Sequence, residues 1–383
     1  MTGPGRFYFS SDLRRLGQDN DKEFKVRVLK LAALMLLAVG CAKEGANNSG
    51  TASSTATSSG SVDLTGAGAT FPYPIYSKWF ADYAQRTGVK INYQSIGSGG
   101  GIRQLSEETV DFGASDSPMS DDEMSKAKGG PVLHIPTVLG AVVITYNVPG
   151  LSAPLNLTSK AIADIFAGRV TKWNDTRITS LNAGAKLPAN DILVVHRSDG
   201  SGTTYIFTDY LSKAVPAWNT SVGKGKEVKW PVGLGAKGNE GVAGQIKQTP
   251  GAIGYVELAY AKQNNLPTAA VTNKAGKSIL PSVAAVTAAA AAASGTLPAN
   301  TDYRISIVDA PGADSYPISS FTWILAYQNQ RDANKGKKLV DFLNWALTDG
   351  EAEAAALDYA PLPTDMAAKV KSRLATIKTA ASQ

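Results

Sequence analysis

From residue 62 onward, short runs rich in β-branched residues alternate with segments of helical periodicity, and no other feature constrains the fold as strongly. Lys90 to Ile96 is typical of a strand, whereas Ile75, Trp79 and Tyr83 recur at the spacing of one helix face. Strands that alternate with helices form mostly parallel sheets covered by helices. The sequence therefore predicts an α/β fold with mostly parallel strands.

Three helix starts are predicted from local signals. Gly97 to Gly101 forms a turn into a helix that starts near Ile102, and the strand Asp191 to His196 leads to a helix from about Tyr205. The segment Ser120 to Glu123 has the residues of a capping box, in which serine and glutamate each bond the other's main-chain N–H. A helix is therefore expected to begin there too.

Apolar segments in the middle and near the end of the chain predict buried strands. Leu133 to Val138 and Ala141 to Tyr146 are expected to be separate strands divided by Gly140, where the chain crosses between two lobes. Ser319 to Tyr327 is expected to be a strand that returns to the first lobe. Separately, Gly88 is expected to be the C-cap of the helix that contains Ile75, Trp79 and Tyr83.

Basic residues and a short apolar run mark the N-terminal region. Lys25, Arg27 and Lys30 precede an apolar stretch over 31–40. This stretch is well below the ~20 residues that a membrane-spanning helix needs. It predicts a signal peptide over 1–40 that is cleaved, with translation expected to start near residue 26.

The segment Leu37 to Cys41 resembles the lipobox of bacterial lipoproteins, which implies that Cys41 is lipidated. Cys41 is the only cysteine, so no disulfide within the chain is possible. The residues that follow, to Ser61, are rich in Ser, Thr, Ala and Gly and predict a flexible tether over 41–61. In the alternative interpretation, residues 26–41 form a core helix and Cys41 is an ordinary small apolar residue.

Charge and composition exclude several classes of function. The formal net charge is +6, but seven Lys or Arg and four Asp or Glu fall within 1–40, so the remainder is only weakly basic. Basic residues interleaved with aromatics are absent, which argues against nucleic-acid binding. No metal-binding cluster or phosphate-loop motif occurs, so neither a metal nor another cofactor is expected.

Three loops carry hydroxyl and glycine residues between a strand and a helix. They are Ala69 to Phe71, Gly97 to Gly100, and Arg197 to Thr203. At the carboxyl ends of strands, such loops and the helix N-termini beyond them favour small anions. The alternatives are ordinary helix capping by each loop and, for Arg197, simple pairing with Asp199.

The sequence also resembles a known family. The segments that carry the resemblance are TGAGATFPYPIYSKW (65–79), IGSGGG (96–101), VDFGASDSPMS (110–120), HRSDGSGTTYIFTDYL (196–211), KWPVGLGAKGNEG (229–241) and GAIGYVELAYAKQNNL (251–266). They resemble the periplasmic phosphate-binding protein of the phosphate-specific ABC transporter. The resemblance covers about 64–363.

The resemblance implies a two-lobed periplasmic-binding-protein fold of type II, in which each lobe is a mostly parallel sheet flanked by helices and the ligand lies in the cleft. Lobe I would comprise 62–138 and 316–383, and lobe II 139–315. It implies a monomer that binds inorganic phosphate in the periplasm or at the cell surface, is held at the membrane by its lipid, and delivers phosphate to the transmembrane subunits of the importer.

The resemblance also implies a set of ligand residues, which share hydroxyl, amide, guanidinium or carboxylate groups. These are Thr70, Phe71, Ser98, Asp116, Arg197, Ser201, Gly202 and Thr203. Asp199 is implied to pair with Arg197. Asp116 would accept a hydrogen bond from protonated phosphate, whereas ionised sulfate offers no proton. Its alternative interpretation is a turn or N-cap aspartate.

An enzyme is the competing class, as a phosphate-binding protein with phosphatase-like activity; a related oxyanion binder and a surface scaffold that borrows the fold are further alternatives. Ser98 and Ser201 lie in glycine-rich turns, but neither has the G-x-S-x-G pattern of a nucleophile elbow. Of the two histidines, His134 lies in an apolar strand and is expected in the core, and His196 is expected to flank the site without acting in it. No enzymatic activity is predicted.

Overall fold

The computed structural model describes residues 64–151, 153–294 and 302–379. The predicted signal peptide, the lipidation site Cys41 and the tether lie outside the described residues. No helix in the described ranges is long and apolar enough to cross a membrane.

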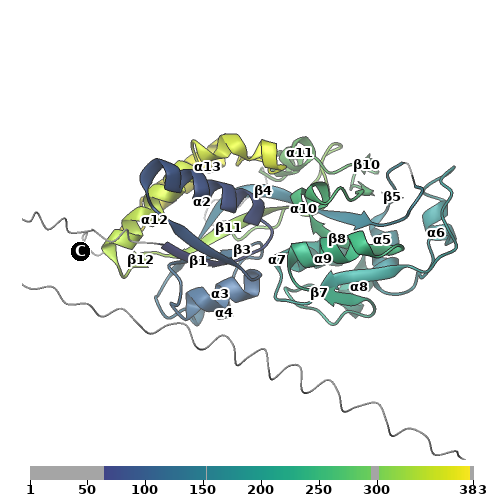
Figure 1. The fold of residues 1–383 in the computed structure, drawn as a ribbon, viewed down its shortest axis with the longest axis horizontal. Coiled ribbons are helices and arrows are strands. Elements are labelled where there is room, and N and C mark those ends of the chain that lie inside the picture. The colour runs from purple at the N-terminus through teal and green to yellow at the C-terminus, as the bar shows by residue number, and fades with distance from the viewer. Residues whose placement is uncertain (1–63, 152, 295–301, 380–383) are drawn as a thin grey trace, which may run out of the picture. The chain divides into compact units, whose positions relative to one another are not determined.

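Eight strands form one large curled sheet in the order β2-β1-β3-β11-β4-β8-β6-β7, with helices on its faces (Figure 1). The strands of this sheet are β1 (Leu64–Gly68), β2 (Ile91–Ser95), β3 (Phe112–Ser115), β4 (Val132–Tyr146), β6 (Leu193–Arg197), β7 (Leu234–Ala236), β8 (Ala252–Glu257) and β11 (Ser319–Tyr327). The shorter strands are β5 (Asn156–Leu157), β9 (Ala270–Thr272), β10 (Ser278–Ile279), β12 (Asn329–Gln330) and β13 (Lys378–Thr379). The predicted α/β fold is confirmed.

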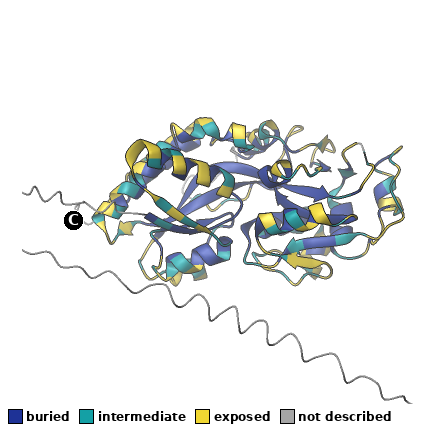
Figure 2. Cartoon of the chain, in the orientation of Figure 1, coloured by how far each residue is buried: buried dark blue, intermediate teal, exposed yellow. Residues whose placement is uncertain are grey.

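The helices of the described chain connect these strands. They are α2 (Tyr73–Thr87), α3 (Ser98–Ser106), α4 (Asp121–Ser125), α5 (Ser159–Phe166), α6 (Thr176–Thr179), α7 (Gly202–Ala214), α8 (Pro216–Ser221), α9 (Gly238–Gln248), α10 (Leu258–Gln263), α11 (Val283–Ser294), α12 (Ala333–Ala346) and α13 (Thr364–Leu374), with 3-10 turns at Gly350–Glu353 and Ala355–Leu357. The inner strands β3, β4, β8 and β11 are buried, whereas the edge strands β2 and β7 are partly exposed. Exposed residues gather on the outer sides of the helices (Figure 2).

β4 joins the two ends of the large sheet. Residues 132–141 pair antiparallel with β11, and Val142 to Tyr146 pair antiparallel with β8. On either side the strands are parallel, β1 with β2 and β3, and β6 with β7 and β8. The prediction of two strands divided by Gly140 is therefore wrong, because a single buried strand runs through this glycine and changes partner just after it.

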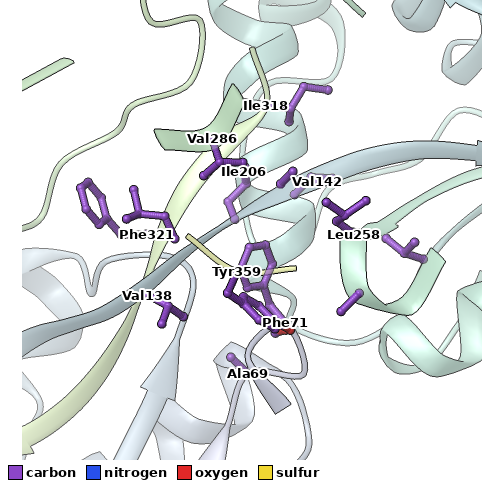
Figure 3. Close-up of a cluster of buried hydrophobic side chains, with 14 of the residues drawn as sticks. Ala69, Phe71, Val138, Val142, Ile206, Leu258, Val286, Ile318, Phe321 and Tyr359 are labelled. Atoms are coloured by element: carbon purple, nitrogen blue, oxygen red, sulfur yellow. The ribbon is translucent and has the colours of Figure 1, made fainter. Parts of the chain in front are cut away.

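Gly140 is needed for the close approach of an aromatic ring rather than for a break in the strand. A Cβ atom at this position would lie 2.7 Å from the Phe71 ring. The Phe71 and Tyr359 rings lie beside this part of β4, with centroids 6.4 Å apart (Figure 3). β4 thus packs directly against the loop that follows β1.

Several local predictions are confirmed and others shift. Ser120 and Glu123 form both bonds of the capping box at α4, and Gly88 closes α2 in the left-handed conformation with φ 76°. Two helices begin earlier than predicted, α3 at Ser98 rather than near Ile102 and α7 at Gly202 rather than near Tyr205. The glycines were expected to delay both helices, but they are accommodated in the first turns.

The first strand extends further along the chain than predicted. The β-branched residues of Val62 to Thr65 predict a short strand, followed by a loop over Gly66 to Pro74. Instead, β1 runs to Gly68 and pairs with β2 along its length and with β3 from Gly66 to Gly68. Glycine is a poor strand former, so a prediction from residue propensities ends this strand too early. The close packing explains the glycines, because a Cβ on Gly66 would overlap the Phe112 ring.

Gly101 on α3 provides a test of how tightly helix and sheet are packed. A Cβ there would lie 2.5 Å from Cα of Gly68 and 2.6 Å from the carbonyl oxygen of Ala67, both main-chain atoms of β1. Gly101→Ala should lower the free energy of unfolding by about 1–3 kcal/mol, as overpacking does. Gly244→Ala, in α9 with nothing within 4 Å of the added Cβ, should raise it by about 0.5–1 kcal/mol. Urea unfolding of both variants measures the difference, and equal effects would contradict this account.

Candidate functional site

Three of the predicted site residues, together with Asn239, lie at the N-termini of three helices. Ser98 is the first residue of α3, Gly202 and Thr203 open α7, and Asn239 is the second residue of α9. Each helix follows a strand of the large sheet, so the N-terminal N–H groups and the positive ends of the helix dipoles meet at one place. This arrangement favours an anion.

Ser98 is the centre of the first group of contacts. Its Oγ accepts hydrogen bonds from the main-chain N–H of Asp116 and from that of Gly202, both at 3.1 Å, and it lies 3.4 Å from Oδ2 of Asp116. Gly202 is packed so closely that a Cβ would lie 2.5 Å from both Asp116 Oδ2 and Ser98 Oγ. The loops that follow β2, β3 and β6 therefore meet in direct contact.

Asp116 is an acidic residue with almost no exposure to solvent. Its side chain is 1% exposed, and Oδ1 accepts a hydrogen bond from the Thr322 hydroxyl on β11 at 2.8 Å. Burial raises the pKa of Asp116 to about 7, although the Thr322 hydrogen bond, the Arg197 charge and Ser98 act in the opposite direction. The N-cap of α4 is Ser120, so the N-cap interpretation of Asp116 is wrong.

Arg197 ends β6 and forms the second group of contacts. Its Nε and Nη2 donate to the Asp199 carboxylate at 2.8 and 2.5 Å, and Nη1 donates to Thr203 Oγ1 at 3.2 Å. Although burial opposes ionisation, the hydrogen bonds and charge of Arg197 hold the pKa of Asp199 below its usual value. The pairing with Asp199 is present, and together with the bond to Thr203 it uses three of the five guanidinium N–H groups.

The remaining predicted residues are placed as follows. Thr70 lies after β1 with its Oγ1 bonded to Asn239, and the carbonyl oxygen of Phe71 accepts from the Tyr359 hydroxyl at 2.7 Å. Ser201 is the N-cap of α7 and accepts from the main-chain N–H of Thr204. Every predicted ligand residue is buried.

The two histidines are engaged away from the serines. His134 is fully buried, as predicted, with Nδ1 2.6 Å from Asp302 Oδ2 and Nε2 accepting from the Met119 N–H. His196 stacks on Trp230 with ring centroids 4.8 Å apart, and burial lowers its pKa. Neither ring is hydrogen-bonded to Ser98 or Ser201 in the described structure, so neither histidine is placed to act as a general base for these serines.

Three residues of the site were missed at the level of sequence. Asn239 bonds Thr70 and Thr203, Thr322 bonds Asp116, and the Tyr260 hydroxyl donates to the Thr70 carbonyl oxygen at 2.6 Å. Asn239 follows a strand and a glycine at the start of a helix, the same pattern that identified the other loops. Thr322 and Tyr260 carry no such local signal.

A groove of about 740 Å³ borders this cluster on one side. Its lining includes Ser117, next to Asp116, and Lys226, whose carbonyl oxygen accepts from the Ser201 N–H at 2.9 Å. Lys226 Nζ also forms an ion pair with Glu123 of α4 at 2.5 Å. None of the predicted ligand residues lines the groove. In the parts of the chain that are described, no group of three or more His, Cys, Asp or Glu could hold a metal ion.

The chain is similar to known proteins over most of its length. Residues 50–349 match the family model described as PBP superfamily domain. The phosphate-binding proteins PstS of Pasteurella multocida and of Xylella fastidiosa are each 45% identical to it, over 82% of this chain and 90% and 85% of theirs. The phosphate-binding protein PfluDING, solved with phosphate bound, is similar in fold with a TM-score of 0.66 at 24% identity, over 81% of this chain and 93% of its own.

The raised pKa of Asp116 makes stability depend on pH in a defined direction. The folded state holds this proton up to about pH 7, whereas the ordinary carboxyl loses it near pH 3.8, so the stabilisation is complete below pH 3.8 and is lost as the pH rises to 7. In the unaltered protein the free energy of unfolding falls over this range by roughly 4 kcal/mol at most. Asp116→Asn has no titrating carboxyl at this position and does not show this fall. Melting temperatures of the ligand-free variant should exceed those of the unaltered protein increasingly from pH 4.5 to 7.5. A constant difference over this range would contradict a buried, titrating Asp116.

Proposed function

The chain belongs to the PBP superfamily and to the PstS phosphate-binding proteins within it, and from this premise we propose that it binds inorganic phosphate outside the cytoplasmic membrane and delivers it to a phosphate ABC importer. The observation that carries the proposal is the buried meeting of Ser98, Asp116 and Gly202 with Arg197 and Thr203. The proposed ligand residues are Thr70, Phe71, Ser98, Asp116, Arg197, Ser201, Gly202 and Thr203.

The donors fit a tetrahedral oxyanion. Hydroxyl groups, helix N-terminal amides and the two guanidinium N–H groups of Arg197 not used by Asp199 and Thr203 can replace the water around a small anion. Asp199 offsets the charge of Arg197, so the ligand is held mainly by hydrogen bonds. This balance suits a carrier, which must release its ligand to the importer.

The protein acts as a binding component without catalysis in this proposal. Ser98 Oγ already accepts from two main-chain amides, and Ser201 Oγ caps α7. A nucleophile needs an adjacent base, and both histidines are engaged elsewhere. After cleavage of the signal peptide over 1–40, a lipid on Cys41 would hold this monomeric protein at the membrane.

We further propose two lobes, with 62–138 and 316–383 forming the first and 139–315 the second. Three contacts that support a closed arrangement link them: the Gly202 N–H to Ser98, the Gly99 N–H to the Gly200 carbonyl oxygen at 2.8 Å, and the Lys226 ion pair with Glu123. Ligand that bridges both lobes would shift an opening equilibrium toward this form.

Calorimetry with phosphate and sulfate tests the function. At pH 8 the ionised Asp116 should accept a proton-bearing phosphate oxygen and repel sulfate, a mismatch of roughly 3–5 kcal/mol that corresponds to about 10² to 10⁴ in affinity. Sulfate binding should strengthen as the pH falls below 7, because protonated Asp116 becomes a donor. Asp116→Asn should remove most of the pH dependence of sulfate binding and reduce the ratio between the affinities for phosphate and sulfate. Sulfate binding equal to that of phosphate at pH 8 would refute the proposal.

The Lys226 ion pair with Glu123 should slow the release of phosphate. Lys226→Met should raise the dissociation rate constant several-fold in stopped-flow experiments, because one attraction across the closed lobes is lost. Lys126→Met is the matched control, since Lys126 pairs with Asp122 on the same helix at 2.6 Å. Equal rates in the two variants would show that the pair does not hold the lobes together.

A further inference from the structure

Asn239 occupies a buried position between two of the proposed ligand hydroxyls. It is 0% exposed, and its Nδ2 donates to Thr70 Oγ1 at 2.8 Å and to Thr203 Oγ1 at 3.1 Å. Its Oδ1 accepts from the main-chain N–H of Glu257 at 3.0 Å. Since that partner can only donate, the amide orientation is fixed by the network.

Each of the two threonine hydroxyls receives two donors. Thr70 Oγ1 also accepts from the Asn239 main-chain N–H at 3.3 Å, and Thr203 Oγ1 also accepts from Arg197 Nη1 at 3.2 Å. A hydroxyl has two acceptor lone pairs and one hydrogen. With both lone pairs engaged, each hydroxyl can only donate its hydrogen, and neither does so to another group of the described structure.

Ser98 Oγ is also held by two main-chain donors, although its own hydrogen is directed to Oδ2 of Asp116 at 3.4 Å. Its Oγ accepts from the main-chain N–H groups of Asp116 and Gly202. The main chain thus does for Ser98 what the Asn239 amide does for the two threonines. A neutral amide can do this without adding charge to a site that already contains Arg197.

We propose that Asn239 is a positioning residue that fixes the Thr70 and Thr203 hydroxyls as hydrogen-bond donors to the bound oxyanion. The inference rests on the proposed phosphate binding and adds to it the residue that sets the direction of two donors. Asn239 acts through the threonines and makes no contact with the ligand itself.

Substitution by aspartate separates this role from simple packing. Asn239→Asp keeps the shape of the side chain but replaces the donating NH₂ by an acceptor, so both threonine hydrogens would turn toward it. Asn239→Ala removes the shape and leaves the hydroxyls free to rotate. If Asn239 matters only for packing, phosphate should bind most tightly to the unaltered protein, less tightly to Asn239→Asp and least tightly to Asn239→Ala. If Asn239 fixes the threonine hydroxyls as donors, Asn239→Asp should bind phosphate least tightly of the three.

The affinities for inorganic phosphate are to be measured by calorimetry at pH 7 and 9. We expect a loss of about tenfold for Asn239→Ala and of about a hundredfold or more for Asn239→Asp, with a deficit relative to alanine that grows with pH as the aspartate ionises. The comparison of two variants at one pH cancels the titration of phosphate itself. Aspartate binding better than alanine at both pH values would overturn the inference.

Asn273→Asp is the matched control. Asn273 is 6% exposed, and its Nδ2 donates to the carbonyl oxygens of Gly312, Ala313 and Ser315. Its substitution should lower the melting temperature and leave the phosphate affinity unchanged. A parallel loss of affinity in this variant would mean that destabilisation accounts for the effect and would overturn the inference.

A double-mutant cycle tests the inference without the aspartate variant, should that variant fail to fold. Thr70→Val removes one preset donor and should cost at least tenfold more affinity in the unaltered protein than in Asn239→Ala. Additive losses would overturn the inference. If the unaltered protein does not bind phosphate, the proposed function falls as well; if it binds and only the order or the coupling is wrong, the proposed function stands.

Discussion

The site depends on polar groups that are removed from water and hydrogen-bonded to one another inside the protein. Ser98, Asp116, Arg197 and Thr203 are all buried, and each would be costly there without partners. The partners come from three helix N-termini and from neighbouring hydroxyls. In the closed arrangement these groups hold one another in place, so the donors are oriented for an anion there.

The electrostatic balance follows from the same burial. Arg197 is neutralised by Asp199, which leaves Asp116 as a carboxyl without an opposite charge in direct contact. Burial therefore dominates its protonation and brings its pKa close to neutrality. A carboxyl poised in this way can distinguish ligands by whether they carry a proton, a property that a fully ionised or fully neutral group at this position would lack.

Sequence patterns predicted the fold class and the three loops, because each loop combines strand, glycine, hydroxyl and helix in consecutive residues. The set of proposed ligand residues, Asp116 included, came from the resemblance to the family. The patterns failed where tertiary packing overrides local preference. The glycines before Ile102 and Tyr205 favoured turns, so α3 and α7 were predicted to begin later than they do. Gly140 allows the close approach of the Phe71 ring and does not end a strand. Thr322 and Tyr260 reach the site from distant segments, so only the folded structure reveals them.

The uninterrupted course of β4 has a mechanical consequence. One strand supplies hydrogen-bonding partners to β11 at one end and to β8 at the other. If the strands on one side of β4 unfolded, β4 would lose a partner strand and would support the strands on its other side less well. The folded unit should therefore unfold cooperatively. Any rotation of one side of the sheet relative to the other must likewise bend β4, and this bending opposes the rotation elastically.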